Sequence, residues 1–241
     1  PGRDETTDVK GALSGVRVIE MAGLGPTPFC GMLLGDMGAE VIRIERVEDA
    51  GLGIAIPYEY DLRNRNKRSI ALDLKAPQGR EALARLLSGA DVLLEGFRPG
   101  VMERLGFGPG RCLELQPKLV FARATGWGQD GPLAQRAGHD VNYIALAGAL
   151  DMIGPSDGPP SLPLNLIGDY AGGALYMAFG ILCALRSAEA TGQGQVVDAA
   201  MIDGVTSLLT VFHGMRQTGM LRLRGENILD GGAPYYRCYR T

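Results

Sequence analysis

The stretch VRVIEMAGLGPTPFCGMLLGDMGAEVIRIE, residues 16–45, decides the fold class. It begins and ends with short runs of branched apolar residues, 16–20 and 41–45, which are typical of buried strands. Between them, the turn GLGPTP leads into apolar residues at helical spacing over 29–37. Two strands joined by a helix of this length predict a right-handed crossover and a parallel sheet.

The alternation of strands and helices continues through the first half of the chain. Further strands are expected at 69–74, 91–94 and 119–124, and a helix at 79–87 separates the first two. The sequence therefore predicts an α/β fold, a doubly wound, Rossmann-like parallel sheet flanked by helices. In such folds, ligands collect at the carboxyl ends of the strands.

The second half of the chain is richer in glycine and in helical spacing. The remaining elements are expected to be helices at 141–153, 169–186 and 200–218 and a strand at 195–198. Residues 1–220 are expected to form one large domain. Residues 221–241, which include RGENILDGGAPYY, are loop-like, and we expect them to be a linker into a second, small domain.

Composition excludes several classes of protein. The formal net charge of −3 and the pI near 5.5 argue against a nucleic-acid partner, because phosphate backbones require a basic surface. No apolar run reaches the length of a membrane-spanning helix and the first residues lack an apolar signal core, so an intracellular location without membrane insertion is expected. The cysteines form no Cys-x-x-Cys pair, which favours buried thiols over a metal site or a disulfide framework; they are Cys30, Cys112, Cys183 and Cys238.

Familiar nucleotide and hydrolase motifs are missing or incomplete. Gly23 and Gly25, with Glu45 at the end of the second expected strand, imitate a dinucleotide fingerprint. However, a third glycine is absent, and Pro26 and Pro28 remove backbone N–H groups that a pyrophosphate would need. No Walker loop, Gly-x-Ser-x-Gly elbow or His-Glu-x-x-His occurs, so phosphoryl transfer, serine hydrolysis and zinc hydrolysis lack their usual residues.

A basic cluster precedes the third expected strand, in the segment LRNRNKRS. Such clusters usually form a solvated face. Their position next to strands nevertheless favours one phosphate-sized pocket and an anionic, adenine-bearing ligand, since arginine forks match phosphate geometry. The residues expected to contribute are Arg46, Arg63, Arg65, Lys67 and Arg68, with Arg98 and Arg104 in addition.

His139 and Asp169 are the candidate acid/base pair. Both follow glycine and both stand where a loop runs into an apolar helical pattern, so each is expected near a helix N-terminus facing a pocket. A lone histidine is more often structural than catalytic. The neighbouring Asp140 and the second carboxylate in a similar setting favour a role for His139, whereas His213 lies in an apolar helical pattern and is interpreted as structural.

Several long motifs together make the sequence similar to a known family. They are LSGVRVIEMAGLGPTPFCGMLLGDMGAEVIRIER, DVLLEGFRPGVMERLGFGP, TGWGQDGP, AGHDVNY, PLNLIGD, GQGQVVDAAM and RGENILDGGAPYY. They resemble the α-methylacyl-CoA racemases, a branch of the family III (CaiB/BaiF-like) CoA-transferases, over nearly the whole chain. The resemblance implies an enzyme that inverts the 2-methyl centre of acyl-CoA thioesters by removing and returning the α-proton.

The resemblance also implies roles for particular residues. His139 of the GHD motif and Asp169 of the GDY motif would be the two catalytic acid/base groups. The CoA and thioester contacts would come from Arg46, Ala71, Leu72, Asp73, Leu74, Lys75, Arg104, Gly138, Asp140, Val141, Asn142 and Tyr143. No metal or redox cofactor is implied, because coenzyme A is part of the substrate. In eukaryotes the implied location would be mitochondrial or peroxisomal.

The implied chemistry needs a base, an acid on the opposite face and donors for the oxygen of the enolate. Asp169 must be protonated in one direction, and the apolar residues around it are expected to raise its pKa. The backbone N–H of Asp140, at the start of a helix, is the candidate oxyanion donor.

Alternatives remain within the same family. Its transferases use an aspartate nucleophile, at the position of Asp140, although the preceding histidine favours the racemases. Family members look like interlocked homodimers, and they continue beyond GGAPYY into a small domain that carries a glutamate supporting the histidine. This chain is therefore expected to be a fragment, and the third alternative is an inactive CoA-binding module.

Overall fold

The computed structural model describes residues 11–48, 51 and 53–240. These residues form two compact units. Unit 1 contains the described residues up to Arg123 together with Met177–Val197, and unit 2 contains Ala124–Tyr176 and the described residues from Asp198 onward. The division expected at residue 220 concerns a small domain and stays a prediction.

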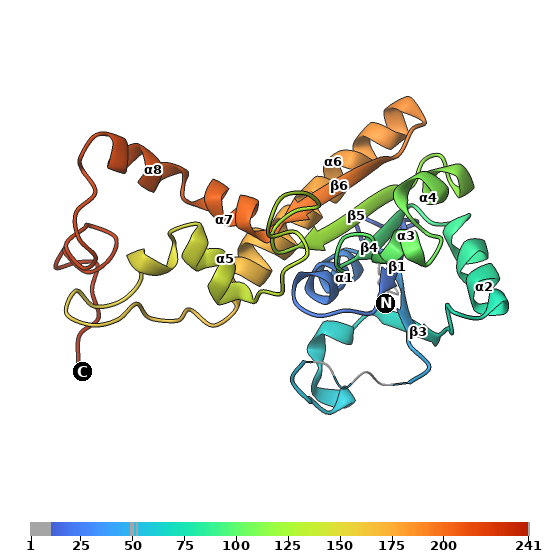
Figure 1. Cartoon of the computed structure of the whole chain (residues 1–241), viewed down its shortest axis with the longest axis horizontal. Coiled ribbons are helices and arrows are strands. Elements are labelled where there is room, and N and C mark those ends of the chain that lie inside the picture. The colour runs from blue at the N-terminus through green and yellow to red at the C-terminus, as the bar shows by residue number, and fades with distance from the viewer. Residues whose placement is uncertain (1–10, 49–50, 52, 241) are drawn as a thin grey trace, which may run out of the picture. The chain divides into compact units, whose positions relative to one another are not determined.

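One six-stranded sheet runs in the order β3-β2-β1-β4-β5-β6 (Figure 1). The strands are β1 (Arg17–Met21), β2 (Glu40–Glu45), β3 (Lys67–Ala71), β4 (Val92–Glu95), β5 (Val120–Thr125) and β6 (Gln195–Ala200). The pairings from β3 through β5 are all parallel. The outward order from β1 in both directions is that of a doubly wound fold, so the predicted fold class is confirmed.

The central strands consist mainly of apolar residues in continuous runs, because helices cover both faces of the sheet. Every residue of β4 and β5 is buried, whereas the edge strand β3 is mostly exposed. The core of unit 1 forms around Ile19, Leu93 and Phe121 of the strands and Leu83 and Leu87 of a covering helix.

Proline in the first turn starts three helices of unit 1, where its missing N–H needs no partner. The helices of this unit are α1 (Pro26–Asp36), α2 (Pro77–Leu87), α3 (Val101–Arg104), α4 (Pro109–Leu115) and most of α6 (Tyr176–Thr191). Right-handed crossovers in opposite directions put α1 on one face of the strands and α2 and α4 on the other, as Figure 1 shows. Two single 3₁₀ turns, Tyr58–Tyr60 and Leu62–Asn64, precede β3.

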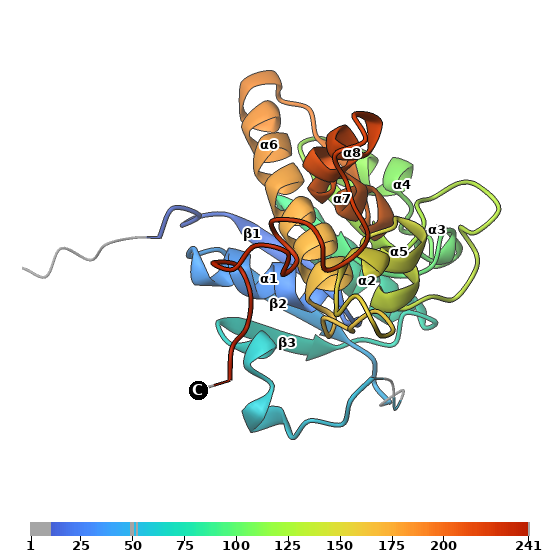
Figure 2. The same cartoon turned by 90° about the vertical axis from the view of Figure 1, so that its left-hand side faces the viewer.

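Unit 2 is mainly helical. Its elements are α5 (Asp140–Leu146), a 3₁₀ turn (Leu150–Met152), the π-helix η4 (Leu166–Leu175), α7 (Met201–Leu208) and α8 (Thr210–Gln217). The π-helix packs against α7 and α5 (Figure 2). A Cβ on Gly204 of α7 would overlap the carbonyl oxygen of Gly172, so glycine allows the two backbones to touch. Ile144 and Val205 form the centre of a small core here.

Most expected elements are confirmed within one to three residues, including the third strand, which lies at Lys67–Ala71 compared with the expected 69–74. Three expected helices differ more. The helix expected at 141–153 ends at Leu146, since Gly148 has a left-handed φ of 91°. The helix expected at 200–218 is divided at Leu209 into α7 and α8.

The expected helix at 169–186 begins earlier, as η4, and continues as α6. Together they form a helical stretch, Leu166–Thr191, that is long and apolar enough to cross a membrane by length and composition. The expectation that no apolar run reaches this length is therefore wrong. The finding is weak evidence for a membrane, because core helices of soluble proteins pass the same test.

Candidate active site

His139 is the residue that directly precedes α5. Its backbone is extended, and its N–H donates to Oδ1 of Asn142 at 2.9 Å, which fixes the entry of the chain into the helix. The residue is exposed. The expected place of His139 at a helix N-terminus is therefore confirmed.

Asp169 lies in the first turn of η4 and is half-buried. Its Oδ2 accepts a hydrogen bond from Nδ2 of Asn165 at 3.1 Å. Burial raises the pKa of the Asp169 carboxyl, while the hydrogen bond from Asn165 lowers it. The charge of Asp140 raises the same pKa further and that of His139 lowers it, so both groups lie close enough to act on Asp169.

Asp140, the first residue of α5, connects the two candidate catalytic segments. Its Oδ2 accepts a hydrogen bond from the backbone N–H of Asp169 at 2.7 Å, and the residue is 5% exposed. Burial raises the pKa of this carboxyl, whereas the backbone N–H groups of Asp169 and Gly168 lower it. The predicted thioester-contact residue is thus engaged with η4.

Tyr143 lines the glycine loop that precedes the site. A Cβ on Gly138 would lie 2.7 Å from Cε1 of Tyr143, and one on Gly126 would overlap the same ring. The ring of Trp127 meets that of Tyr143 edge-on, with centroids 4.7 Å apart. Trp127 and Gly126 were not among the predicted site residues, although the motif TGWGQDGP indicated their segment. Val141, at the second position of α5, is exposed.

The predicted CoA residues of unit 1 are gathered mainly at the carboxyl ends of two neighbouring strands. Glu45 of β2 is in register with Ala71 of β3, and the N–H of Leu72 donates to the carbonyl of Glu45 at 3.0 Å. Arg46 and residues 71–75 therefore lie side by side. Arg104 ends α3 in the same unit, with its guanidinium next to Gly100.

Ion pairs engage the LRNRNKRS cluster, which is expected to line a phosphate pocket. Each of its four cations is held by a carboxylate: Arg63 by Asp61, Arg65 by Asp36, Lys67 by Glu20 and Arg68 by Glu40. Lys67 and Arg68 also begin β3, at the opposite end of the strand from Ala71. The phosphate pocket stays a prediction, although carboxylates neutralise these four cations. Asp61 lies two residues from Arg63, whereas the partners of the other three cations are remote in sequence.

Two cysteines behave as predicted and two do not. Cys30 and Cys112 are buried, and burial raises the pKa of the Cys112 thiol to about 12. Cys183 and Cys238 are exposed. His213, interpreted as structural, lies exposed on α8.

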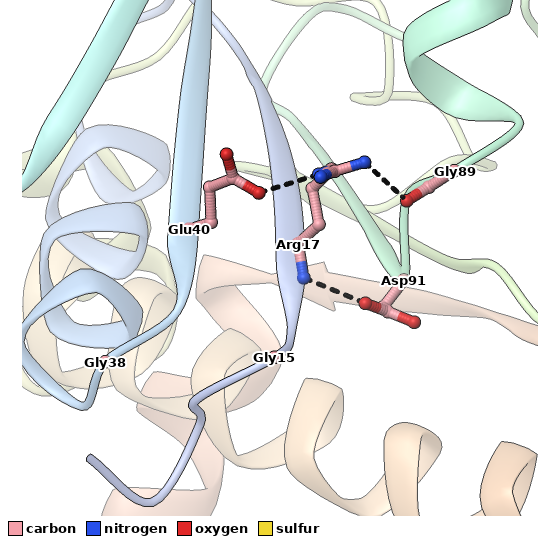
Figure 3. A pocket seen from close by; sticks show the side chains of 6 residues that line it. All are labelled: Gly15, Arg17, Gly38, Glu40, Gly89 and Asp91. Carbon is pink, nitrogen blue, oxygen red and sulfur yellow. Dashed lines mark hydrogen bonds and ion pairs between the residues drawn. The ribbon is translucent and has the colours of Figure 1, made fainter. Parts of the chain in front are cut away.

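A polar pocket of about 480 Å³ opens at the amino ends of β1, β2 and β4 (Figure 3). Arg17 crosses it, donating through Nε to Glu40 at 2.7 Å and through its backbone N–H to Asp91 at 2.8 Å. A third bond reaches the carbonyl of Gly89. These groups satisfy one another and join the strand ends, which is a structural role.

The RGEN segment of the C-terminal stretch is fixed by Arg224. Its guanidinium donates to the carbonyls of Asp151, Pro155 and Gly158. Asn227 is buried, and its backbone and side-chain N–H groups donate hydrogen bonds to the Asp230 carboxylate, which closes the turn. An open pocket of about 940 Å³ lies between this segment and the 154–157 loop.

Comparison with known proteins decides the family. The model of CoA-transferase family III matches residues 13–241. The chain belongs to CoA-transferase family III. Within this family it is 48% identical over 230 residues to the mouse protein named alpha-methylacyl-CoA racemase and 47% identical over 234 residues to the human one, each alignment covering 95% of the chain. A solved CAIB/BAIF family protein from Brucella suis matches with a TM-score of 0.80 and 31% identity over 89% of the chain.

The chain spans only part of the length of these relatives. It spans 58% of the mouse racemase, 59% of the human racemase and 60% of the Brucella suis chain. The predicted family is confirmed.

Proposed function

We propose that the full-length protein is a racemase of 2-methylacyl-CoA thioesters that works by 1,1-proton transfer through an enolate. One side chain removes the α-proton and a second returns a proton to the opposite face. In the reverse direction the two exchange roles. The similarity to proteins named alpha-methylacyl-CoA racemase supports the substrate class.

His139 and Asp169 are the proposed acid/base pair. The observation that carries this assignment is the hydrogen bond from the Asp169 N–H to Asp140, which brings the start of η4 to the residue beside His139. The reaction needs a neutral imidazole with a protonated carboxyl in one direction and the opposite forms in the other. The pKa of Asp169, raised by burial, favours the protonated carboxyl compared with an ordinary aspartate.

The enolate oxygen needs a hydrogen-bond donor. The backbone N–H of Asp140 is our candidate, because the first N–H groups of a helix have no carbonyl partner within it. Arg46, residues 71–75 and Arg104 are proposed to hold the CoA nucleotide. Their support is the shared carboxyl edge of β2 and β3 and the exposed guanidinium groups.

The full-length protein in deuterated water tests the proposal. Each enantiomer of a 2-methylacyl-CoA should acquire deuterium at the α-carbon while it racemises, and mass spectrometry would follow both changes. Product without label would contradict the proposed proton transfer. No change at all would contradict the racemase function.

CoA transfer through Asp140 is the alternative reaction. A nucleophilic carboxylate must reach the thioester carbon, whereas Asp140 is buried and its Oδ2 is occupied by the Asp169 N–H. This observation favours proton transfer. Hydroxylamine trapping of an acyl-enzyme, with movement of CoA to a free carboxylate, would reverse that preference.

The resemblance to the family supports two further proposals, an interlocked homodimer and an intracellular location. Exposed apolar side chains on the η4–α6 stretch, Leu175, Phe179 and Leu182, are compatible with a covering partner. Sedimentation of the full-length protein should give twice the mass of one chain, and a monomer would contradict the dimer.

A further inference from the structure

We propose that Asp140 is a positioning residue: its carboxylate holds the first turn of η4 against the start of α5 and so sets Asp169 opposite His139. The inference rests on the proposed racemase function, in which Asp169 and His139 act on the two faces of one carbon. It replaces a direct role for the Asp140 side chain in chemistry.

The hydrogen bonds of Asp140 run to a distant segment. Oδ2 accepts from the Asp169 N–H at 2.7 Å, across 29 residues of sequence, and the Gly168 N–H also bonds this carboxyl. These N–H groups belong to the first turn of η4, where the helix supplies no acceptor. A carboxylate is the strongest acceptor available for them and also suits the positive end of the helix.

Close packing fixes the Asp140 side chain in this arrangement. A Cβ on Gly168 would lie 2.7 Å from Oδ2 of Asp140 and 3.2 Å from its Cα, so the backbone of η4 lies directly against the side chain. Oδ1 is also buried, and within the described residues no hydrogen-bond partner is found for it. The known hydrogen bonds of this carboxyl therefore all serve the attachment to η4.

The same carboxylate contributes charge next to Asp169. A negative Asp140 raises the pKa of Asp169, in opposition to His139 of α5 and Asn165 of the preceding turn. On α7, which also packs against η4, the titratable residue is Asp203, and it is exposed. Asp140 thus contributes both to the position of Asp169 and to the field that favours its protonated form.

Two variants of the full-length protein separate position from charge. Asp140→Ala removes the acceptor and frees the start of η4, whereas Asp140→Asn retains a carbonyl oxygen for the Asp169 N–H and removes the charge. The readout is the initial rate at which each pure enantiomer exchanges its α-proton with deuterated water, measured beside the rate of inversion and the thermal unfolding midpoint.

For Asp140→Ala, we expect inversion to fall about 10²-fold, the scale of a catalytic group displaced by about 1 Å. Exchange should fall equally for the enantiomer whose proton faces Asp169. The enantiomer that faces His139 should keep exchanging within a few fold, because His139 can return solvent deuterium to the same face. Equal losses for both enantiomers, or no loss, would overturn the positioning role.

For Asp140→Asn, both enantiomers should still exchange their α-proton. The limb of the pH–rate profile that reports Asp169 should move to lower pH, because the charge that raises its pKa is removed. An unmoved limb overturns the field contribution, and this variant decides alone if Asp140→Ala does not fold. Wild-type protein that exchanges neither enantiomer would instead contradict the proposed function, so the two failures are distinguishable.

Discussion

The ammonium group of Lys67 lies 2.6 Å from Oε2 of Glu20, and both side chains are almost fully excluded from solvent. Lys67 also donates to the carbonyl of Pro28 at 2.8 Å. Arg43 adds a second cation, 3.1 Å from the other oxygen of Glu20. The amino end of β3 is therefore attached to β1 and β2 through one buried carboxylate, and to α1 through the hydrogen bond from Lys67 to Pro28.

Lys67→Met should destabilise unit 1, because it leaves the Glu20 carboxylate buried without its closest cation. We expect a loss of about 3–5 kcal/mol in the free energy of unfolding at neutral pH, measured by urea denaturation. Burial already raises the pKa of Glu20 and the charge of Lys67 lowers it, so the variant raises this pKa further. A raised carboxyl pKa contributes stability below the pKa that is lost as pH rises through it, so the deficit should shrink in acid.

The double variant Glu20→Gln/Lys67→Met is the control for this prediction. It removes the charge together with its partner, and it should be more stable than Lys67→Met alone. A double variant as unstable as the single one would show that packing of the lysine stem, and not the buried charge, determines the effect.

Asn165→Ala should shift the activity profile in the direction opposite to Asp140→Asn. Asn165 stabilises the charged form of Asp169 through its 3.1 Å hydrogen bond, so its removal raises the pKa of that carboxyl. The limb that reports Asp169 in the pH dependence of kcat should then move to higher pH. Movement to lower pH would contradict the assigned hydrogen bond.

Gly168→Ala should damage the site although it adds only one methyl group. The new Cβ would lie 2.7 Å from Oδ2 of Asp140, so Asp140 or η4 must move. We expect a loss of roughly 1–3 kcal/mol of stability and a larger loss of inversion than of exchange at the His139 face. Gly214→Ala in α8 is the matched control, because a Cβ there meets nothing within 4 Å, and it should leave activity unchanged. Equal losses of stability and activity in the two variants would rule out crowding at Asp140 as the cause.

Arg46→Ala should weaken CoA binding if the carboxyl edge of β2 and β3 holds the nucleotide. Loss of one charge-assisted hydrogen bond corresponds to about tenfold or more in the dissociation constant, measured by calorimetry with CoA. Arg68→Ala is the comparison, since Arg68 begins β3 at the far end of the strand and pairs with Glu40. A larger effect of Arg68 than of Arg46 would contradict the proposed edge.

The sheet could be predicted because its strands carry local signals. Runs such as 16–20 and 119–124 are branched, apolar and bounded by turns, and burial on both faces gives them this composition. The edge strand β3 lacks that constraint, and its position was predicted two residues too late. The start of α5 at Asp140 could also be predicted, since GHD follows a glycine loop and precedes an apolar helical pattern.

The contacts that assemble the site depend on long-range packing and left no pattern in the sequence. The π-helical geometry around Asp169 accompanies the close approach of Gly172 to Gly204, residues that are remote along the chain. The ion pairs of the basic cluster could not be predicted for the same reason, because Arg65 and Arg68 pair in the fold with Asp36 and Glu40, which are distant in sequence. The hydrogen bond between Asp140 and Asp169 likewise has no local signature.

The bond between Asp140 and the start of η4 limits how this protein can be re-engineered. A chimaera that takes the loop and helix around His139 from one relative and the Asp169 segment from another would combine two halves shaped for different partners. Grafts that carry both segments as one module should retain their alignment, and directed evolution of new acyl specificities would do better to randomise the two segments jointly.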